Sequence, residues 1–181
     1  MSNDEVLGVI NVTSSDLEGV PCQFSKYECL GEFEGPILKG DPVVIDTGDS
    51  HPVSCHPTRF NPGEEEQLKV LLDYLEEKGV IEKTEGATSW SSRVKLVDEE
   101  GKKRFILNLI PLNQLVKKSS YHPPHMGELR KKVRGGRVFC RFDLTKAFFQ
   151  VPLEEASRDK TSFQTPFGCY RFCAMPMGYI S

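Results

Sequence analysis

The sequence predicts an α+β fold, in which helices and antiparallel strands occupy separate stretches of the chain. Three patterns support this: one amphipathic helix over residues 61–79, and two β-hairpins over residues 94–107 and 162–173. Hairpins joined by short turns favour antiparallel sheets, whereas regular strand–helix alternation would favour a parallel one. The chain has 181 residues, enough for one domain or for one domain with an extension.

The helix over residues 61–79 has signals at both ends. Asn61 is a suitable N-cap, Pro62 suits the first helical position, and the acidic residues 64–66 favour the positive end of the helix dipole. Gly79 is placed to end the helix. Apolar residues recur at helical spacing at Leu68, Leu71, Leu72 and Leu75. We interpret this stripe as core packing and not as a cofactor-binding surface.

The two hairpins account for most of the expected strands. The first pairs Val94–Val97 with Phe105–Leu107 across an acidic turn at Asp98–Gly101. The second pairs Ser162–Thr165 with Tyr170–Cys173. Both combine β-branched or aromatic residues with a glycine-containing turn, which is typical of antiparallel pairing.

The other segments give weaker signals. Frequent glycine and proline over the first fifty or so residues indicate an extended lead-in, with a possible short strand at Val43–Ile45. A short helix is expected over Gly127–Val133, ended by Gly135 and Gly136. A strand over Val138–Phe142 would then lead directly into Asp143.

Charge is unevenly distributed along the chain. The net charge of -3 does not exclude nucleic acid as a partner. Between residues 117 and 137 the only acidic residue is Glu128, and the basic residues are Lys117, Lys118, Arg130, Lys131, Lys132, Arg134 and Arg137. This stretch is either a phosphate-contacting surface or a solvated helix face.

Several classes of protein are disfavoured. The six cysteines include no C-x-x-C pair, so we expect no structural zinc site. The sequence shows no signal peptide and no apolar run of membrane length, so we expect no membrane partner and an intracellular location, cytoplasmic or nuclear, with reduced thiols.

Two aspartates suggest catalytic chemistry. Asp143 ends an apolar strand, where it could hold a metal ion, although two-metal phosphoryl transfer needs further carboxylates. Taken alone, Asp143 is more simply explained as a strand-end cap or an ion-pair partner. Asp46–Gly48 follows an apolar run and reads D-T-G, as in aspartic proteases. Only one such motif occurs, so a turn is the simpler interpretation.

Motifs from Ile45 to the end of the chain resemble the reverse transcriptase of gypsy-type LTR retrotransposons, relatives of the retroviral enzymes. The motifs, in order, are Ile45–Pro52, the helix from Asn61 with its tail Glu77–Ile81, Thr88–Ser92, Arg104–Asn113, Phe142–Leu153, Lys160–Phe163 and Met175–Gly178. Each motif is weak alone, but their order and spacing match. In this family the D-T-G lies in the linker upstream of the polymerase.

The resemblance implies the fingers and the first part of the palm of a right-hand polymerase, incomplete in this chain. Residues 1–54 would form the lead-in, 55–117 the first part of the fingers, 118–150 the start of the palm with the first metal-binding motif, and 151–181 the second part of the fingers. The family's second metal-binding motif, an x-D-D hairpin, would lie beyond Ser181.

The resemblance also assigns catalytic roles. Asp143 would be a catalytic metal ligand, with the Leu144 carbonyl also facing a Mg²⁺ ion. The Phe148 ring would occupy the place of a ribose 2′-hydroxyl and so favour deoxynucleotides. Arg104 would bind the incoming triphosphate, because a guanidinium suits phosphate oxygens.

Further residues would shape the rest of the site. Ala147 and Met177 would line the nucleotide pocket. Asn113, Gly178 and the basic region after Lys117 would lie near template and primer.

Two departures from the family pattern concern nucleotide binding. The turn over the triphosphate is normally rich in lysine, whereas here it carries acidic residues from Asp98 to Glu100, which Lys102 and Lys103 could partly offset. Asn108–Ile110 replaces the usual D-Y-R, with loss of a template-contacting arginine.

Two functions follow as expectations. The first is part of an RNA-directed DNA polymerase, inactive alone, whose partners are an RNA or DNA template–primer, deoxynucleotides, and the rest of the palm, thumb and RNase H. The second is a non-catalytic retroelement remnant that at most binds nucleic acid.

Overall fold

The computed structural model describes residues 33–36, 38–86, 88–99, 102–117, 122–136 and 144–180. The chain divides into two units by its internal contacts, one of residues 1–32 and 120–145, the other of residues 33–119 and 146–181. The predicted strand over Val138–Phe142, Asp143 and the tip of the first hairpin lie outside the described residues.

Helix α1 spans Pro62–Glu77, as its sequence predicted. The Asn61 side chain accepts a hydrogen bond from the Glu64 N–H at 2.9 Å, and the Glu64 carboxylate accepts one from the Asn61 N–H at 3.0 Å. This reciprocal capping box satisfies two main-chain donors that the first turn leaves unpaired. Gly79 follows the helix with a φ of 64°, a left-handed conformation that glycine adopts without steric cost.

The first predicted hairpin is also confirmed. Strand β2 (Arg93–Glu99) pairs antiparallel with β3 (Lys102–Asn108), with Val94 opposite Leu107 and Val97 opposite Arg104. Val94 and Leu107 are buried, whereas Arg93, Lys95 and Arg104 are exposed. Alternation along the strands therefore gives the hairpin one core face and one solvent face.

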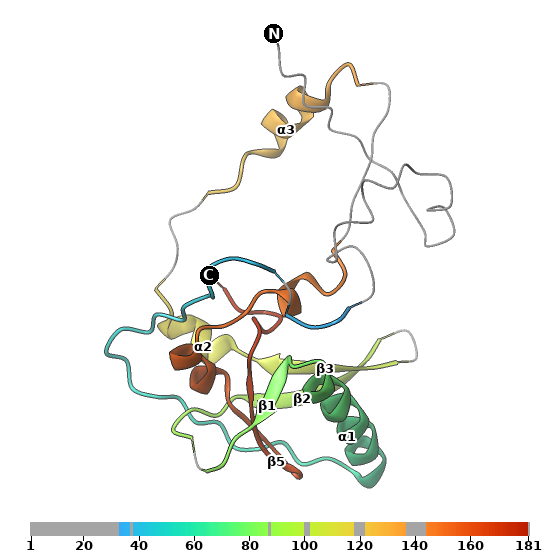
Figure 1. Cartoon of the computed structure of the whole chain (residues 1–181), viewed down its shortest axis with the longest axis vertical. Coiled ribbons are helices and arrows are strands. Elements are labelled where there is room, and N and C mark those ends of the chain that lie inside the picture. The colour runs from blue at the N-terminus through green and yellow to red at the C-terminus, as the bar shows by residue number, and fades with distance from the viewer. Residues whose placement is uncertain are drawn as a thin grey trace. The chain divides into compact units, whose positions relative to one another are not determined.

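A second, three-stranded sheet contains the other predicted hairpin. Strands β4 (Phe163–Thr165) and β5 (Gly168–Phe172) are antiparallel neighbours, and β1 (Ile81–Lys83) pairs with the other edge of β5. Ile81 lies opposite Phe172 and Phe163 opposite Tyr170. These antiparallel strands and the separate helices confirm the α+β class (Figure 1).

Short helical turns connect these elements, and the sequence patterns did not predict them. They are α2 (Ile110–Leu115), the 3₁₀ helix η3 (Ala147–Gln150), α4 (Glu155–Arg158) and the 3₁₀ helix η4 (Asp159–Thr161). Such pieces are too short to show helical periodicity in a sequence.

One apolar core joins α1, both sheets and the upstream segment. Leu68, Leu72 and Leu75 of α1 are buried in it, as the stripe predicted. At its centre the Phe163 ring lies 5.4 Å from Phe105 and 5.7 Å from Phe172, between ring centres. Such tilted aromatic pairs add to the free energy gained by burial.

The strand expected at Val43–Ile45 is reduced to one bridge. Val43 forms a parallel bridge with Leu153: its N–H donates to the Pro152 carbonyl at 2.9 Å, and its carbonyl accepts from the Glu154 N–H at 3.0 Å. Ile45 is fully buried. The segment contacts the sheet region in an irregular conformation because nearby glycine and proline prevent a longer ladder.

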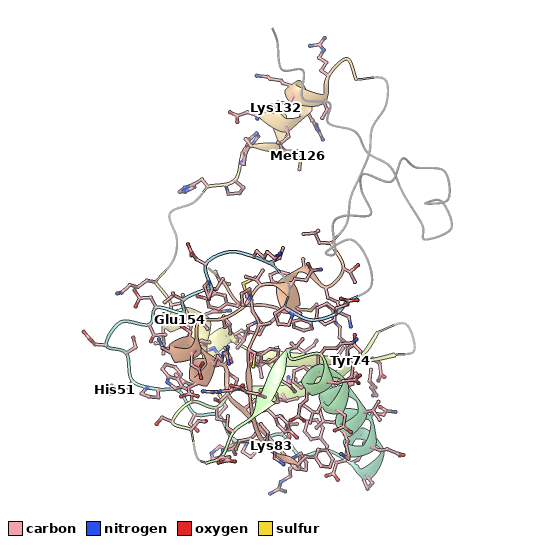
Figure 2. All side chains as sticks on the ribbon, in the orientation of Figure 1. His51, Tyr74, Lys83, Met126, Lys132 and Glu154 are labelled. Atoms are coloured by element: carbon pink, nitrogen blue, oxygen red, sulfur yellow. The ribbon has the colours of Figure 1, made fainter. Side chains whose placement is uncertain are left out.

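Helix α3 (Met126–Val133) lies in the other unit, one residue longer than predicted. None of its residues is buried, and both Met126 and Lys132 are visible on it in Figure 2. Within the described ranges, no helix is both long enough and apolar enough to cross a membrane.

Candidate functional site

A pocket of about 210 Å³ opens between β3 and the residues that follow β5. Its walls include Arg104 and Ile106 from β3, Phe149 and Phe172 from the core, and Met177. The pocket is mainly apolar, with a guanidinium at its wall. Such a combination suits a ligand that has a planar apolar part and an anionic part.

Three predicted site residues meet at this pocket. Arg104, Met177 and Gly178 all line it, and the Arg104 Nη2 lies 3.4 Å from the Met177 Sδ. Strand register explains the position of Arg104, because it lies opposite Val97 on the solvent face of the hairpin. Residues 73 positions apart in the sequence thus come into contact.

Asn113 fixes the loop that carries Met177 and Gly178. Its Nδ2 donates a 2.8 Å hydrogen bond to the Gly178 carbonyl, and its Oδ1 accepts a 3.2 Å bond from the Ile180 N–H. Gly178 has a φ of 88°, where a side chain would be strained. The Asn113 amide therefore holds the wall of the pocket through both of its polar atoms.

Ala147 and Phe148 lie on η3 and are not among the residues that line the pocket. The Phe148 side chain is 43% exposed, and the neighbouring Phe149 contributes the pocket wall instead. Ala147 is half-buried. Ala147 and Phe148 thus precede the pocket-lining Phe149 in the sequence, but neither lines the pocket in this structure.

The structure does not bring the predicted metal ligands together with these residues. Asp143 is outside the described residues, and Leu144 is exposed and belongs to the other unit. Among the residues with described positions, no three His, Cys, Asp or Glu side chains come together as a metal-binding group.

The acidic hairpin is partly neutralised within itself. Asp98 lies opposite Lys103 in the β2–β3 register, and the Lys103 Nζ is 2.7 Å from the Asp98 Oδ2. Lys103 therefore forms an ion pair with an acidic residue of its own hairpin. This pairing offsets the negative charge of Asp98 but leaves Lys103 less available to a triphosphate.

The D-T-G sequence forms a turn, as the simpler interpretation held. The Asp46 Oδ1 accepts a 2.8 Å hydrogen bond from the Gly48 N–H, and its Oδ2 lies 2.8 Å from the Lys117 Nζ. The hydrogen bond from Lys117 and then that from Gly48 lower the pKa of Asp46. Asp46 thus ties the upstream segment to the residue that begins the basic stretch.

Sequence analysis missed an ionic cluster beside the sheet. The Arg171 Nε lies 2.6 Å from the Glu82 Oε1 and its Nη1 lies 2.7 Å from the Asp159 Oδ1, while Arg158 is 3.4 Å from Glu82. Hydrogen bonding to Asp159 and then to Glu82 raises the pKa of Arg171, although burial acts in the opposite direction. Burial, with Glu82 nearby, raises the pKa of the Cys173 thiol to about 11, so this thiol stays protonated at neutral pH.

A basic pocket on the solvent side of β2 was also missed. It has a volume of about 320 Å³ and is lined by Pro57, Thr58, Arg59, Arg93 and Lys95. None of its basic groups pairs with a carboxylate among the described residues. Arg93 and Lys95 share a face because they are two positions apart on a strand, a spacing that the sequence does show.

Comparison with known families agrees with this architecture. The profile described as "Reverse transcriptase (RNA-dependent DNA polymerase)" matches residues 87–181, more than half of the chain. The enzymatic polyprotein of figwort mosaic virus (strain DxS) is 33% identical over 135 residues, 70% of this chain and 19% of the relative. That of cauliflower mosaic virus (strain D/H) is 28% identical over 132 residues, 71% of this chain and 20% of the relative.

A retrotransposon relative matches a shorter stretch. The transposon Tf2-3 polyprotein of Schizosaccharomyces pombe (strain 972 / ATCC 24843) is 30% identical over 80 residues, 44% of this chain and 6% of the relative. The chain thus spans about a fifth, or less, of the length of these three polyproteins.

Solved structures share the fold. The protease–reverse transcriptase of prototype foamy virus superposes with a TM-score of 0.68 at 22% identity, over 87% of this chain and 21% of that one. The foamy viral enzyme in complex with an RNA/DNA hybrid gives a TM-score of 0.72 at 18% identity, over 96% of this chain and 24% of that one. The chain belongs to the reverse transcriptase (RNA-dependent DNA polymerase) family, with homologues in viral and Tf2 retrotransposon polyproteins.

Proposed function

We propose that this chain supplies the nucleotide-facing fingers and the first metal-binding motif of an RNA-directed DNA polymerase from a gypsy-type LTR element. The reaction is template-directed addition of deoxynucleotides to a primer. The observation that carries this proposal is Arg104 beside Met177 at the wall of an apolar pocket, in a chain of the reverse transcriptase family. Arg104 would bind the triphosphate, while Ala147 and Met177 would border the base and sugar.

The proposed metal ion is Mg²⁺, which the Asp143 carboxylate and the Leu144 carbonyl would hold. Oxygen donors of this kind suit Mg²⁺, which prefers carboxylates, carbonyls and phosphate oxygens. When bound, the metal pair of such a site stabilises the attacking and leaving oxygens of the displacement. The remaining carboxylates would come from an x-D-D motif, which the 181 residues do not contain.

Template and primer are the proposed macromolecular partners. The foamy viral protease–reverse transcriptase has been solved with double-stranded DNA and with an RNA/DNA hybrid, and we extend those partners to this chain. Phe148 would exclude the ribose 2′-hydroxyl, and Gly178, held by Asn113, would lie beside the primer–template. The rest of the palm, the thumb and RNase H would complete the polymerase.

Primer extension by a longer polypeptide that continues beyond Ser181 tests the polymerase function. Asp143→Asn is expected to abolish extension, because an amide replaces the anionic metal ligand. Arg104→Ala is expected to raise the KM for deoxynucleotides by about tenfold to a hundredfold, through loss of a charge-assisted contact. Lys69→Ala, on the exposed face of α1, is the matched control. Normal extension by Asp143→Asn would refute the proposal.

The exposed cations favour a second candidate function, which is nucleic-acid binding without catalysis. Arg59, Arg93 and Lys95 line one open pocket, and α3 has Arg130, Lys131 and Lys132 in its last turn. Both sets can neutralise backbone phosphates without reading sequence. In this case residues 1–181 would bind single-stranded nucleic acid but extend no primer with Mg²⁺ or Mn²⁺.

Fluorescence anisotropy of the 181-residue chain with a labelled single-stranded oligonucleotide tests the binding. Affinity should fall steeply with salt, and the double variant Arg93→Gln with Lys95→Gln should lower the slope of log K against log salt by about 1.4. Lys69→Gln removes one positive charge outside this pocket and should leave the slope unchanged. Salt-independent binding, or no binding at low salt, would eliminate this function.

A further inference from the structure

Lys146 has a main-chain conformation that residues with side chains rarely adopt. Its φ and ψ are 48° and 45°, in the left-handed region. No other non-glycine residue in the described part of the chain has a positive φ. Because the Cβ atom crowds the following carbonyl in this conformation, neighbouring contacts must stabilise it.

The ammonium group of Lys146 lies against two aromatic rings from distant segments. Its Nζ is 4.3 Å from the centre of the Tyr74 ring and 5.0 Å from the centre of the Phe33 ring. The same Nζ donates a 2.8 Å hydrogen bond to the Tyr74 hydroxyl. Tyr74 belongs to α1 (Figure 2), and Phe33 to the segment upstream of the sheets. We call Lys146, Tyr74 and Phe33 the Lys146 clamp.

The Lys146 clamp lies at the start of η3, the helix that carries Phe148. The Lys146 carbonyl accepts a 2.9 Å hydrogen bond from the Phe149 N–H, and the Phe148 carbonyl accepts a 3.2 Å bond from the Val151 N–H. Phe33 also packs against Phe149, with ring centres 6.3 Å apart. Phe148 therefore projects, half exposed, from a main chain that is held on both sides.

We propose that Lys146 is a positioning residue for Phe148 and thereby for the choice between deoxyribonucleotides and ribonucleotides. The inference rests on the proposed function, in which the Phe148 ring excludes a ribose 2′-hydroxyl. Exclusion of a single hydroxyl requires the ring to be held to about 0.5 Å. The clamp supplies this constraint through the left-handed turn at Lys146 and through the Phe33–Phe149 contact, without Lys146 itself touching the nucleotide.

Three variants of the 181-residue chain separate the clamp from general effects. Lys146→Met keeps a long flexible side chain but loses the charge, whereas Lys146→Arg keeps a cation able to lie on both rings. Lys69→Met is the matched control, because Lys69 also lies over a ring, that of Phe167 at 5.7 Å, but on the exposed face of α1. A further variant, Tyr74→Phe, removes only the hydroxyl that accepts from Lys146.

Hydrogen exchange at the Phe149 and Val151 amides, followed by NMR, measures the positioning directly. Lys146→Met should accelerate exchange at both amides by about threefold to tenfold, the factor that corresponds to loss of a cation–π contact. Tyr74→Phe should also accelerate exchange at both amides, but by a smaller factor. If Lys146→Met does not fold, the exchange rates of Tyr74→Phe test the proposal instead. Lys146→Arg and Lys69→Met should leave the rates unchanged. Unaltered rates in Lys146→Met, or in Tyr74→Phe where it alone folds, would overturn the proposal.

The ratio of affinities for dATP and ATP in the presence of Mg²⁺ measures the consequence for sugar selection. The unsubstituted chain should bind dATP more tightly than ATP. Lys146→Met should reduce this ratio of affinities by about threefold or more, whereas Lys146→Arg should keep the ratio of the unsubstituted chain. A ratio unchanged by Lys146→Met would overturn the role in selection. If the unsubstituted chain bound neither nucleotide, the proposed nucleotide site and its selectivity would fail, and the amide exchange rates would still decide whether Lys146 positions Phe148.

Discussion

Helices α1 and α3 carry apolar residues at similar spacing, but only α1 buries them. Leu68, Leu72 and Leu75 of α1 enter the core. On α3, Met126, Leu129 and Val133 are spaced three and four residues apart and remain 62%, 40% and 38% exposed. Both helices have N-caps, Asn61 for α1 and His125 for α3, so local capping does not explain the difference.

The difference shows what tertiary packing adds to a local helix signal. Helix α1 contacts β1 and β3, so its stability includes the burial of a whole apolar face. The eight-residue α3 has a cap, Glu128 in its first turn and basic residues in its last turn, all of which suit the helix dipole. Helices of this length are marginal in water when only local interactions support them.

Truncation of one leucine in each helix should give the largest contrast. Leu72→Ala removes a side chain that is 1% exposed and should cost about 2–5 kcal/mol of unfolding free energy. Leu129→Ala should cost less than about 0.5 kcal/mol. Urea unfolding followed by far-UV circular dichroism, to which both helices contribute, measures both costs. Equal costs would contradict the division between a packed and an unpacked helix.

Removal of one charge from the ionic cluster should have an intermediate effect. Burial opposes ionisation of Glu82, but hydrogen bonding to Arg171 and Cys173 outweighs it and lowers its pKa. Glu82→Gln should therefore cost about 1 kcal/mol at pH 7, since solvent screens this partly exposed group. A lowered folded-state pKa means that this stability is present above the ordinary pKa of 4.5 and is lost as pH falls through the folded value.

Urea unfolding from pH 7 to pH 3 measures this effect. The wild-type advantage over Glu82→Gln should shrink toward the acidic end. Glu128→Gln on α3 is the control, because no ion pair of Glu128 occurs among the described residues. A cost that stayed constant with pH would show that the cluster stabilises by packing instead of by charge.

The smallest effect should come from the ion pair that ties the upstream segment down. Asp46→Asn removes the pair with Lys117, both of whose side chains are more than half exposed. Because the pKa of Asp46 is lowered, the small loss should be seen above its ordinary value of 3.8 and should vanish as pH falls below the folded value. Salt should also reduce it. Asp49→Asn, three residues further on, is the control, because no ion pair of Asp49 occurs among the described residues.

Local signals in the sequence predicted the elements that local physics controls. The capping residues of α1, the alternation in β2 and β3 and the turn before β5 all depend on neighbours a few residues away. The short turns of η3 and α2 gave no such signal. The strand expected at Val43–Ile45 proved to be one bridge, to Leu153, because nearby glycine and proline prevent a longer ladder. The order and spacing of short motifs also predicted the reverse transcriptase family, to which the chain belongs.

Tertiary structure alone decided which of these residues meet. It brought Arg104 to Met177, engaged Asn113 with Gly178 and paired Asp98 with Lys103. It also placed Lys146 in a left-handed turn between Phe33 and Tyr74, which lie 113 and 72 positions away. The reason is physical: helix caps and strand alternation act over a few residues, whereas ion pairs, ring contacts and pockets depend on distances through space that the order of residues does not encode locally.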